Sequence, residues 1–235
     1  MKTTLNILVL TLFAVGFLAC NGAPEGEQVD AGEKVEKSEA TKSAAQAGMS
    51  YMVNTDTSKV TWVGSKWMGE DHTGYINLKS GTLTVNDGNI VDGTFTLDMT
   101  SITDTDLAPE DGKEKLEGHL KSDDFFNVSE YEEGTFEIVE VKQAGDNPDA
   151  THQIVGNLTL KGITKSVTIP AKISMTENEL TATTPQFTID RTEWEVMYGS
   201  SALGLAKDKI INDRVGLTIE LQAAPKEEMT EKMDS

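Results

Sequence analysis

The sequence predicts an all-β fold, an eight-stranded antiparallel barrel with one short helix. The first observation is that apolar and polar residues alternate in successive segments, which is the period of a strand with one buried face. The second is that turn-forming residues separate these segments, and the third is that a single segment has a helical period. Eight strands with one apolar face each can close into a barrel without exposed sheet edges, and a two-sheet sandwich is the competing architecture.

Three strands are expected before the helix, at residues 59–63, 73–85 and 91–100. The third has the clearest pattern, because every second residue from Val91 to Met99 is apolar or glycine and the residues between them are polar. The residues just before it, Asn86-Asp87-Gly88, have the composition of a tight hairpin turn. The second and third strands are therefore expected to meet at this turn.

The short helix is expected at residues 109–122. Pro109 suits the first turn of a helix, and Leu116, His119 and Leu120 share one face at i, i+3 and i+4. Two glycines inside the segment weaken the helix. The pattern therefore predicts a helix that is shorter than the segment.

Five strands are expected after the helix, at residues 135–143, 152–160, 166–175, 180–190 and 214–222. The second and third of these form a hairpin, residues 156–175, around which we expect the chain to be organised. Each arm of the hairpin has one apolar face, and an isolated hairpin is only marginally stable in water. The other alternating segments are expected to cover that face and complete the barrel.

The barrel domain is assigned to residues 51–223, and the start of the chain has a different character. Residues 1–19 have a positive start and an apolar run that is too short to favour a spanning helix, so they predict a secretory signal peptide. Residues 17–20, FLAC, resemble a lipobox, which makes Cys20 the expected lipidation site. The alternative is an ordinary signal peptide and a free thiol. A multiply acylated cysteine would hold the protein stably on a membrane.

Two further segments are expected to lie outside the barrel. Residues 20–50, beginning with the acylated cysteine, contain no aromatic residue and few large apolar ones, so they predict a flexible tether, with a transient helix around residues 33–47 as the alternative. Residues 224–235 predict a disordered tail.

The charge balance limits the partners of the chain. Acidic residues outnumber basic ones by 39 to 20, and the net charge of −19 repels nucleic acid, which we exclude as a partner. The two arginines, Arg191 and Arg214, each follow an aspartate and are expected to form structural ion pairs at strand ends. Arg191 is the better candidate to contact a polar head group. The single cysteine excludes an intramolecular disulfide.

Four motifs carry a resemblance to a known family. They are Trp62, HLKSDDFF at residues 119–126, GNLTLKGITK at residues 156–165 and IDRTEW at residues 189–194. In this order they resemble the YceI-like family of bacterial polyisoprenoid-binding proteins across residues 51–223. The resemblance implies a lipocalin-like barrel in the cell envelope that encloses a long amphiphile such as an isoprenoid quinone. It implies no enzymatic activity.

An eight-stranded barrel is either packed by its own side chains or wide enough for one small ligand. Small residues on the apolar faces, Gly93, Gly156 and Ala171, fit a channel and equally fit the bends of a barrel wall. The resemblance favours the cavity. Its expected ligand-binding residues are Trp62, Phe95, Leu97, Phe136, Leu158, Leu160, Ile169, Ile173, Arg191 and Trp194.

Simple energetics suggest a long ligand. Each buried methylene contributes roughly 0.8 kcal/mol, and association costs about 4 to 15 kcal/mol. A ten-carbon chain, at about 8 kcal/mol, would bind weakly or not at all, whereas a longer polyprenyl chain would bind tightly. No cofactor is expected other than the bound lipid itself. This lipid could be an isoprenoid quinone or another polyprenyl lipid.

The sequence leaves three candidate functions. The first is a membrane-anchored lipoprotein, facing the periplasm or the cell surface, that binds or carries a long-chain isoprenoid or similar lipid. The second is an envelope interaction module with a packed barrel, whose partner is another copy of the chain or another protein. The third is a lipid-modifying enzyme.

Few residues favour the enzyme. The three histidines, His72, His119 and His152, lie far apart in the sequence and show no metal-ligand spacing, so no metal site is expected. His119 is expected to pack or hydrogen bond between helix and barrel. Asp123-Asp124 is a carboxylate pair of the kind used in acid-base catalysis, but a solvated local cap is the simpler interpretation. No catalytic residue is therefore expected.

Overall fold

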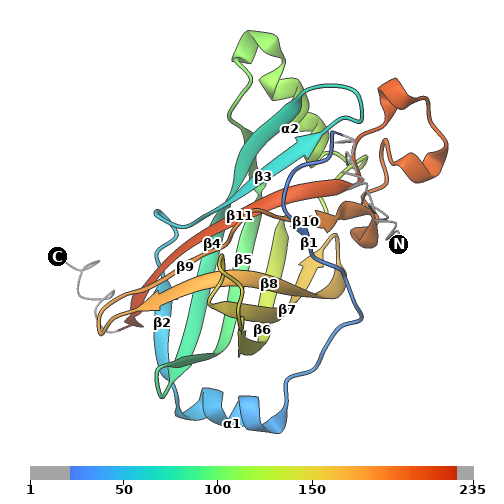
Figure 1. Cartoon of the computed structure of the whole chain (residues 1–235). Coiled ribbons are helices and arrows are strands. Elements are labelled where there is room, and N and C mark those ends of the chain that lie inside the picture. The colour runs from blue at the N-terminus through green and yellow to red at the C-terminus, as the bar shows by residue number, and fades with distance from the viewer. Residues whose placement is uncertain (1–21, 227–235) are drawn as a thin grey trace, which may run out of the picture.

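The computed structural model describes residues 22–226, and strand pairing within them forms a closed ring (Figure 1). The eight wall strands are β3 (Lys59–Ser65), β4 (Asp71–Asn86), β5 (Asn89–Asp104), β6 (Glu133–Gln143), β7 (His152–Leu160), β8 (Ile163–Met175), β9 (Leu180–Thr183) and β11 (Arg214–Pro225). Each pairs antiparallel with the next, from β3 to β9, and β11 pairs with both β9 and β3. The predicted eight-stranded barrel is therefore confirmed.

Two tight turns fix the register of the longest hairpins. Asp87 and Gly88 both have positive φ, at 49° and 75°, so the predicted turn between β4 and β5 has the type I′ backbone that matches strand twist. Lys161 and Gly162, with φ of 48° and 72°, form the same kind of turn between β7 and β8. The hairpin predicted at residues 156–175 is present.

The strand predicted at residues 180–190 is divided in two. β9 ends at Thr183, and β10 (Phe187–Asp190) begins after Pro185. Proline has no backbone N–H to donate to a ladder, so the strand is interrupted there. Both pieces still pair with β11, β9 with residues 220–223 and β10 with residues 214–217.

The N-terminal segment completes the wall beside this break. β1 (Glu27–Gln28) pairs in parallel with β10, and Gly32 bridges Ser166 of β8. Val29, between these contacts, is buried in a core cluster with Val167 and Phe187. Residues 27–32 therefore join β10 to β8 by main-chain hydrogen bonds and add an apolar side chain to the interior.

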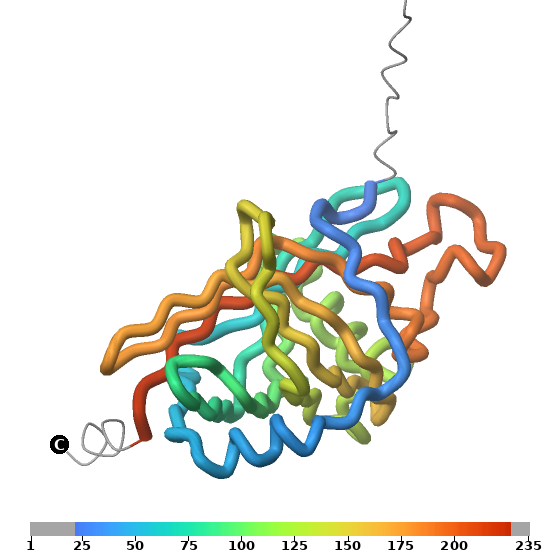
Figure 2. Tube along the Cα trace, turned by 60° about the horizontal axis from the view of Figure 1, so that its bottom comes forward, coloured from blue at the N-terminus to red at the C-terminus, as the bar shows by residue number. Residues whose placement is uncertain are grey.

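The rest of this segment also lies along the barrel, as Figure 2 shows, and thus differs from the flexible tether that its composition predicts. Asn157 exchanges two hydrogen bonds with the backbone of Val35, at 3.0 and 2.8 Å. Helix α1 (Glu39–Ala47) then begins at Ser38, whose hydroxyl accepts from the N–H of Thr41. β2 (Met49–Val53), which the pattern did not predict, pairs with β4 and β11.

Helical segments lie at the other end of the barrel. The predicted helix is present as a 3-10 turn, η1 (Pro109–Asp111), and α2 (Lys113–Lys121), separated by Gly112 at φ 100°. Three further 3-10 turns follow β10, namely η2 (Arg191–Trp194), η3 (Ser201–Leu203) and η4 (Lys207–Lys209). Within residues 22–226, no helix has the length and apolar character needed to cross a membrane.

Several predictions concern the ends of the chain. The signal peptide at residues 1–19 and the lipidation site at Cys20 lie outside the described residues, as do residues 227–235 of the predicted tail. Ala224 and Pro225 differ from that prediction, because they extend β11 and pair with Met52 and Tyr51 of β2.

Candidate ligand-binding cavity

Two adjoining cavities, of about 120 Å³ and about 180 Å³, lie inside the barrel. Both are bordered by the same five apolar residues, which are Val60, Leu97, Leu158, Ile189 and Leu217. The cavities are therefore neighbours inside the barrel, separated by a ring of aliphatic side chains. We refer to them as the inner cavity (120 Å³) and the outer cavity (180 Å³).

The inner cavity is almost entirely apolar. Thr184 is the one residue in its lining that carries a side-chain oxygen, and the others are aliphatic or aromatic. They come from the inward faces of strands all around the barrel, as the period of two requires. Such a space offers an apolar chain burial with little polar competition.

The outer cavity adds polar groups to an apolar wall. α2 contributes Leu116 and Leu120, and Phe125 and Phe126 follow it. The polar lining residues include Lys66, His72, Arg191 and Asn212. The polar atoms of these residues contribute almost nothing to the cavity surface, so the outer cavity also offers an apolar chain an apolar lining.

Nine of the ten predicted ligand-binding residues line these cavities. The inner cavity has Phe95, Phe136, Ile169 and Ile173, and the outer cavity has Trp62, Leu160 and Arg191. Leu97 and Leu158 border both. Eight of the nine lie on strands, where inward positions repeat every second residue, and Arg191 lies in η2.

Trp194 lies outside both linings. It belongs to η2, where the chain leaves the alternation of β10, and its side chain is fully buried in a core cluster. Its indole Nε1 donates to the carbonyl of Leu158 at 3.1 Å. Trp194 therefore packs behind the barrel wall and lines neither cavity, so its predicted place in the lining is wrong.

The small inward residues do not all leave empty space. A Cβ on Gly156 would lie 2.2 Å from the ring of Phe136, so the glycine makes room for that ring. A Cβ on Gly93 would similarly meet the side chains of Leu83 and Ile138. Ala171, in contrast, borders the inner cavity. The glycines thus shape the wall, and the alanine widens the channel.

The Arg191 guanidinium is hydrogen bonded to other groups of the protein. Its guanidinium, 4% exposed, donates to the carbonyls of Asn212, Val196 and Ile211 and pairs with Asp213 at 3.2 Å. Burial lowers the pKa of Arg191 despite the opposing effect of Asp213 and then Asp190. Arg191 therefore forms an ion pair, but with Asp213 and not with the adjacent Asp190 as predicted, and Arg214 forms no ion pair within residues 22–226.

Trp62 is the clearest unsatisfied donor in the cavity wall. Its side chain is 8% exposed and borders the outer cavity, yet its Nε1 has no hydrogen-bond partner among the described residues. Its ring lies against Gly74 of β4, where a Cβ would come within 2.4 Å of it. A ligand oxygen is the kind of partner that this N–H lacks.

His119 packs and hydrogen bonds as the sequence predicts, but its partners lie on loops and not on the barrel strands. Its ring makes edge contacts with Phe125 and Tyr198, at centroid distances of 4.9 and 4.6 Å. Its Nε2 lies 3.0 Å from a carboxylate oxygen of Asp124. His119 and Asp124 thus tie the end of α2 to the loops around it.

His72 differs from the prediction that no histidine has metal-ligand partners. Its Nδ1 and one carboxylate oxygen each of Asp104 and Asp106 lie within 4.8 Å of one another. No sequence spacing reveals this group, because Asp104 lies 32 positions from His72 and reaches it through the pairing of β4 with β5.

A closed antiparallel barrel with an apolar interior is the architecture of small-ligand carriers such as the lipocalins. The chain belongs to the YceI-like domain family, which its residues 51–223 match. The resemblance noted from the motifs is thereby confirmed.

Relatives with curated sequences share parts of this domain. A UPF0312 protein of Pseudomonas aeruginosa is 41% identical over 92 residues, which cover 36% of this chain and 46% of that protein. A UPF0312 protein of Yersinia pestis is 32% identical over 122 residues, or 52% of this chain and 56% of that protein. The chain thus spans about half the length of the curated relatives it matches.

Two solved structures share the fold. BcnA of Burkholderia cenocepacia superimposes with a TM-score of 0.56 at 22% identity, over 72% of this chain and 98% of BcnA. A polyisoprenoid binding domain from Saccharophagus degradans gives a TM-score of 0.54 at 13% identity, over 75% of this chain and 99% of that domain.

Proposed function

We propose that this protein binds one long-chain isoprenoid or similar amphiphile inside its barrel and holds it in the bacterial cell envelope. The observation that carries the proposal is the pair of adjoining cavities inside the barrel, both of which have an almost entirely apolar surface. The fold shared with a polyisoprenoid binding domain from Saccharophagus degradans supports the same ligand class.

The size of the interior agrees with a chain-shaped ligand. The two cavities together reach the lower end of the roughly 300–1,000 Å³ typical of ligand pockets. Each methylene that enters gains roughly 0.8 kcal/mol, so a chain must occupy both cavities to overcome the cost of association. Leu97 and Leu158, which border both, would then contact the middle of the ligand.

The position of the N-terminal segment suggests how the protein meets its ligand. The carbonyl of Gly22, two residues after Cys20, accepts a hydrogen bond from Ser65, and Ser65 lines the outer cavity. If Cys20 is acylated, as we propose, the membrane lies at this end of the barrel.

Exposed apolar side chains gather on the loops at that same end. They are Met68 on the β3–β4 loop and Tyr198, Leu203 and Leu205 on the loop after η2. Figures 1 and 2 show both loops beside the start of the described chain. We propose that these loops touch the membrane surface and that the ligand enters through the outer cavity.

The test is to extract the purified full chain with organic solvent and identify the released lipid by mass spectrometry. We expect about one long-chain lipid per protein. Leu158→Trp places an aromatic ring between the two cavities, and Ile169→Trp places one in the inner cavity. Each variant should reduce lipid occupancy at least about tenfold, because a buried aromatic ring takes the space of several methylenes.

Thr168→Trp is the matched control, because Thr168 neighbours Ile169 on β8 but faces solvent. Its lipid occupancy should equal that of the parent protein. A folded parent protein that releases no lipid and takes none up from detergent-solubilised polyprenol would overturn the proposal and favour a packed barrel that binds another protein.

A further inference from the structure

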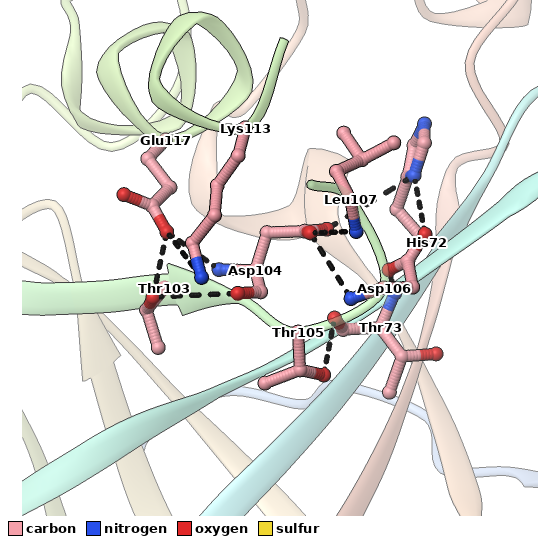
Figure 3. Close-up of polar contacts among 9 residues, drawn as sticks. All are labelled: His72, Thr73, Thr103, Asp104, Thr105, Asp106, Leu107, Lys113 and Glu117. Atoms are coloured by element: carbon pink, nitrogen blue, oxygen red, sulfur yellow. Dashed lines mark hydrogen bonds and ion pairs between the residues drawn. The ribbon is translucent and has the colours of Figure 1, made fainter. Parts of the chain in front are cut away.

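Three side chains with metal-binding atoms converge beside the outer cavity, at the end of the β4–β5 hairpin opposite its turn. His72 lies near the start of β4, Asp104 is the last residue of β5, and Asp106 follows two residues later. Figure 3 shows their side chains turned toward one another. His72 Nδ1 lies 3.0 Å from Asp106 Oδ2 and 4.0 Å from Asp104 Oδ2.

The backbone orients the two carboxylates in the same way. Asp104 Oδ1 accepts from the N–H groups of Leu107 and Asp106, at 2.8 and 3.2 Å. Asp106 Oδ1 accepts from the N–H of Thr73 at 2.6 Å. Each carboxylate therefore uses one oxygen for main-chain contacts and turns the other, Oδ2, toward His72. Supporting hydrogen bonds of this kind hold metal-ligating side chains in position before a metal ion binds.

Asp104 supplies an independent reason to expect a ligand. Its side chain is fully buried, and its Oδ2 has no hydrogen-bond partner in the described part of the chain. A buried carboxylate oxygen without a partner is costly unless a cation or a proton neutralises it. The oxygen points into the group that contains His72 and Asp106, so a cation placed there would satisfy it.

The pKa values of the two carboxyl groups shift in opposite directions. Burial raises the pKa of Asp104, and although the N–H of Leu107 opposes it, the neighbouring Asp106 adds to the rise. The pKa of Asp106 is lowered, because hydrogen bonds from Thr73 and His72 outweigh the effect of its burial. Glu117 of α2 accepts from the N–H of Asp104 at 2.9 Å and fixes the end of β5.

We propose that His72, Asp104 and Asp106 form a binding site for a divalent transition-metal ion of the Zn²⁺ class. One imidazole nitrogen and two carboxylate oxygens are ligands of such ions, whereas Ca²⁺ prefers six to eight oxygens. Metal bonds of about 2.1 Å in a tetrahedron separate the ligand atoms by about 3.4 Å, which lies between the two distances from His72. The site shares His72 with the lining of the outer cavity, but it does not depend on the proposed lipid function.

The fourth position of the ion would be open. His72 borders the outer cavity, and the side chains of His72 and Asp106 are 27% and 37% exposed, so water or another small ligand can reach the ion. Three protein ligands with one open position are typical of zinc sites that bind an exchangeable ligand.

The experiment measures binding of ZnCl₂ to the full chain, purified in detergent and stripped with a chelator, by titration calorimetry. We expect one Zn²⁺ per chain, and CoCl₂ should give the visible absorption of four-coordinate Co²⁺. His72→Gln and Asp106→Asn should each weaken Zn²⁺ binding at least about tenfold, because removing a ligand costs no less than removing its supporting contacts. Asp104→Asn should have the same effect.

Asp124→Asn is the matched control, because the His119–Asp124 pair has the same 3.0 Å spacing but lacks a buried third carboxylate. It should leave Zn²⁺ binding unchanged. If Asp104→Asn fails to fold, the more exposed Asp106 and His72 still test the site. The proposal would be overturned if the parent chain did not bind Zn²⁺, or if the His72→Gln/Asp106→Asn double variant bound it with equal affinity. The unpaired Asp104 oxygen would then be explained by a proton shared with Asp106.

Discussion

Two sides of the outer cavity differ in the pairing of their largest buried polar side chains, although the smaller Thr188 hydroxyl of β10 also has no partner within residues 22–226. On the side of β10 and η2, the Arg191 guanidinium makes four polar contacts, and the Trp194 N–H donates to Leu158. On the side of β3 to β5, the Trp62 N–H and one oxygen of Asp104 have no partner within residues 22–226. These two atoms lie along one row of the sheet, because Trp62 and Asp104 both pair with Gly74.

We propose that the difference separates groups that hold the fold from groups that bind a ligand. Buried polar atoms in native proteins are nearly always paired, so each exception requires an explanation. We call the first set the Arg191 side and the second the Trp62 side. If the interpretation is correct, removing polar groups from the Arg191 side unfolds the protein, whereas removing them from the Trp62 side mainly changes what it binds.

The largest effect is expected for Arg191→Met. The variant leaves Asp213 without its partner and three carbonyls without a donor in a buried place, and breaking such a buried pair costs about 3–5 kcal/mol. The free energy of unfolding, measured with urea, should fall by that amount. Arg191→Lys should recover little of it, because one ammonium group cannot reach all of these acceptors.

Arg214→Met is the control for this variant, because Arg214 is the other arginine of the chain and is exposed. Its stability should stay within about 0.5 kcal/mol of the parent. Equal losses from both variants would mean that the Arg191 contacts contribute no more than general charge.

A smaller effect distinguishes the two tryptophans. Trp194→Phe leaves the Leu158 carbonyl without its donor and opens space in a fully buried cluster, so it should cost about 2–3 kcal/mol. Trp62→Phe also shrinks a ring, but at a cavity wall, and it removes an unpaired N–H, so its cost should stay below about 1 kcal/mol. Urea unfolding of both variants measures the contrast.

This contrast would be contradicted if Trp62→Phe were less stable than Trp194→Phe. In that case the Trp62 indole would contribute more to the fold than Trp194 does, despite its unpaired N–H. Thermal unfolding in the presence and absence of added polyprenol then gives a second measurement, because a ligand that contacts only the folded state raises the unfolding temperature.

Much of the barrel could be predicted because the alternation of inward and outward side chains along a strand depends only on neighbouring residues. Strand alternation alone assigns inward and outward faces, and it placed Phe95 and Ile169 in the lining without any knowledge of the pairing. The prediction for Trp194 is wrong, because this residue lies beyond the strand predicted at residues 180–190 and alternation does not assign its direction. Its position follows β10 in sequence, but the chain turns into η2 there and the period of two no longer applies.

The metal-binding atoms could not be predicted, because they depend on contacts between distant segments. Irregular pairing between β4 and β5 near Tyr75 and Asn77 sets which residue of β5 comes beside the start of β4, and no sequence pattern gives that shift. The N-terminal segment is similar. Its composition predicts a flexible chain, yet it is fixed by Asn157 and by Asp92, residues far along the sequence.

Lys37, in that segment, provides the smallest test of the same contrast between paired and unpaired groups. Its ammonium group lies 2.7 Å from Asp92 and 2.8 Å from Glu137 and is mostly buried. Burial pushes the pKa of Lys37 down, but its hydrogen bonds to Asp92 and Glu137 outweigh this and raise it. Lys37→Met should cost about 1 kcal/mol at neutral pH, whereas Lys34→Met, which removes an exposed pair with Glu36, should cost almost nothing.

The pH dependence of the Lys37 effect has a definite sign. Because the pKa of Lys37 is higher in the folded protein, its contribution is fully present below the unfolded value of about 10.4 and is lost as the pH rises through the folded value. The stability difference between the parent and Lys37→Met should therefore be constant from neutral pH to about pH 9 and shrink above that. A difference that persists unchanged at high pH would assign the effect to packing of the lysine methylenes against the barrel rather than to its charge.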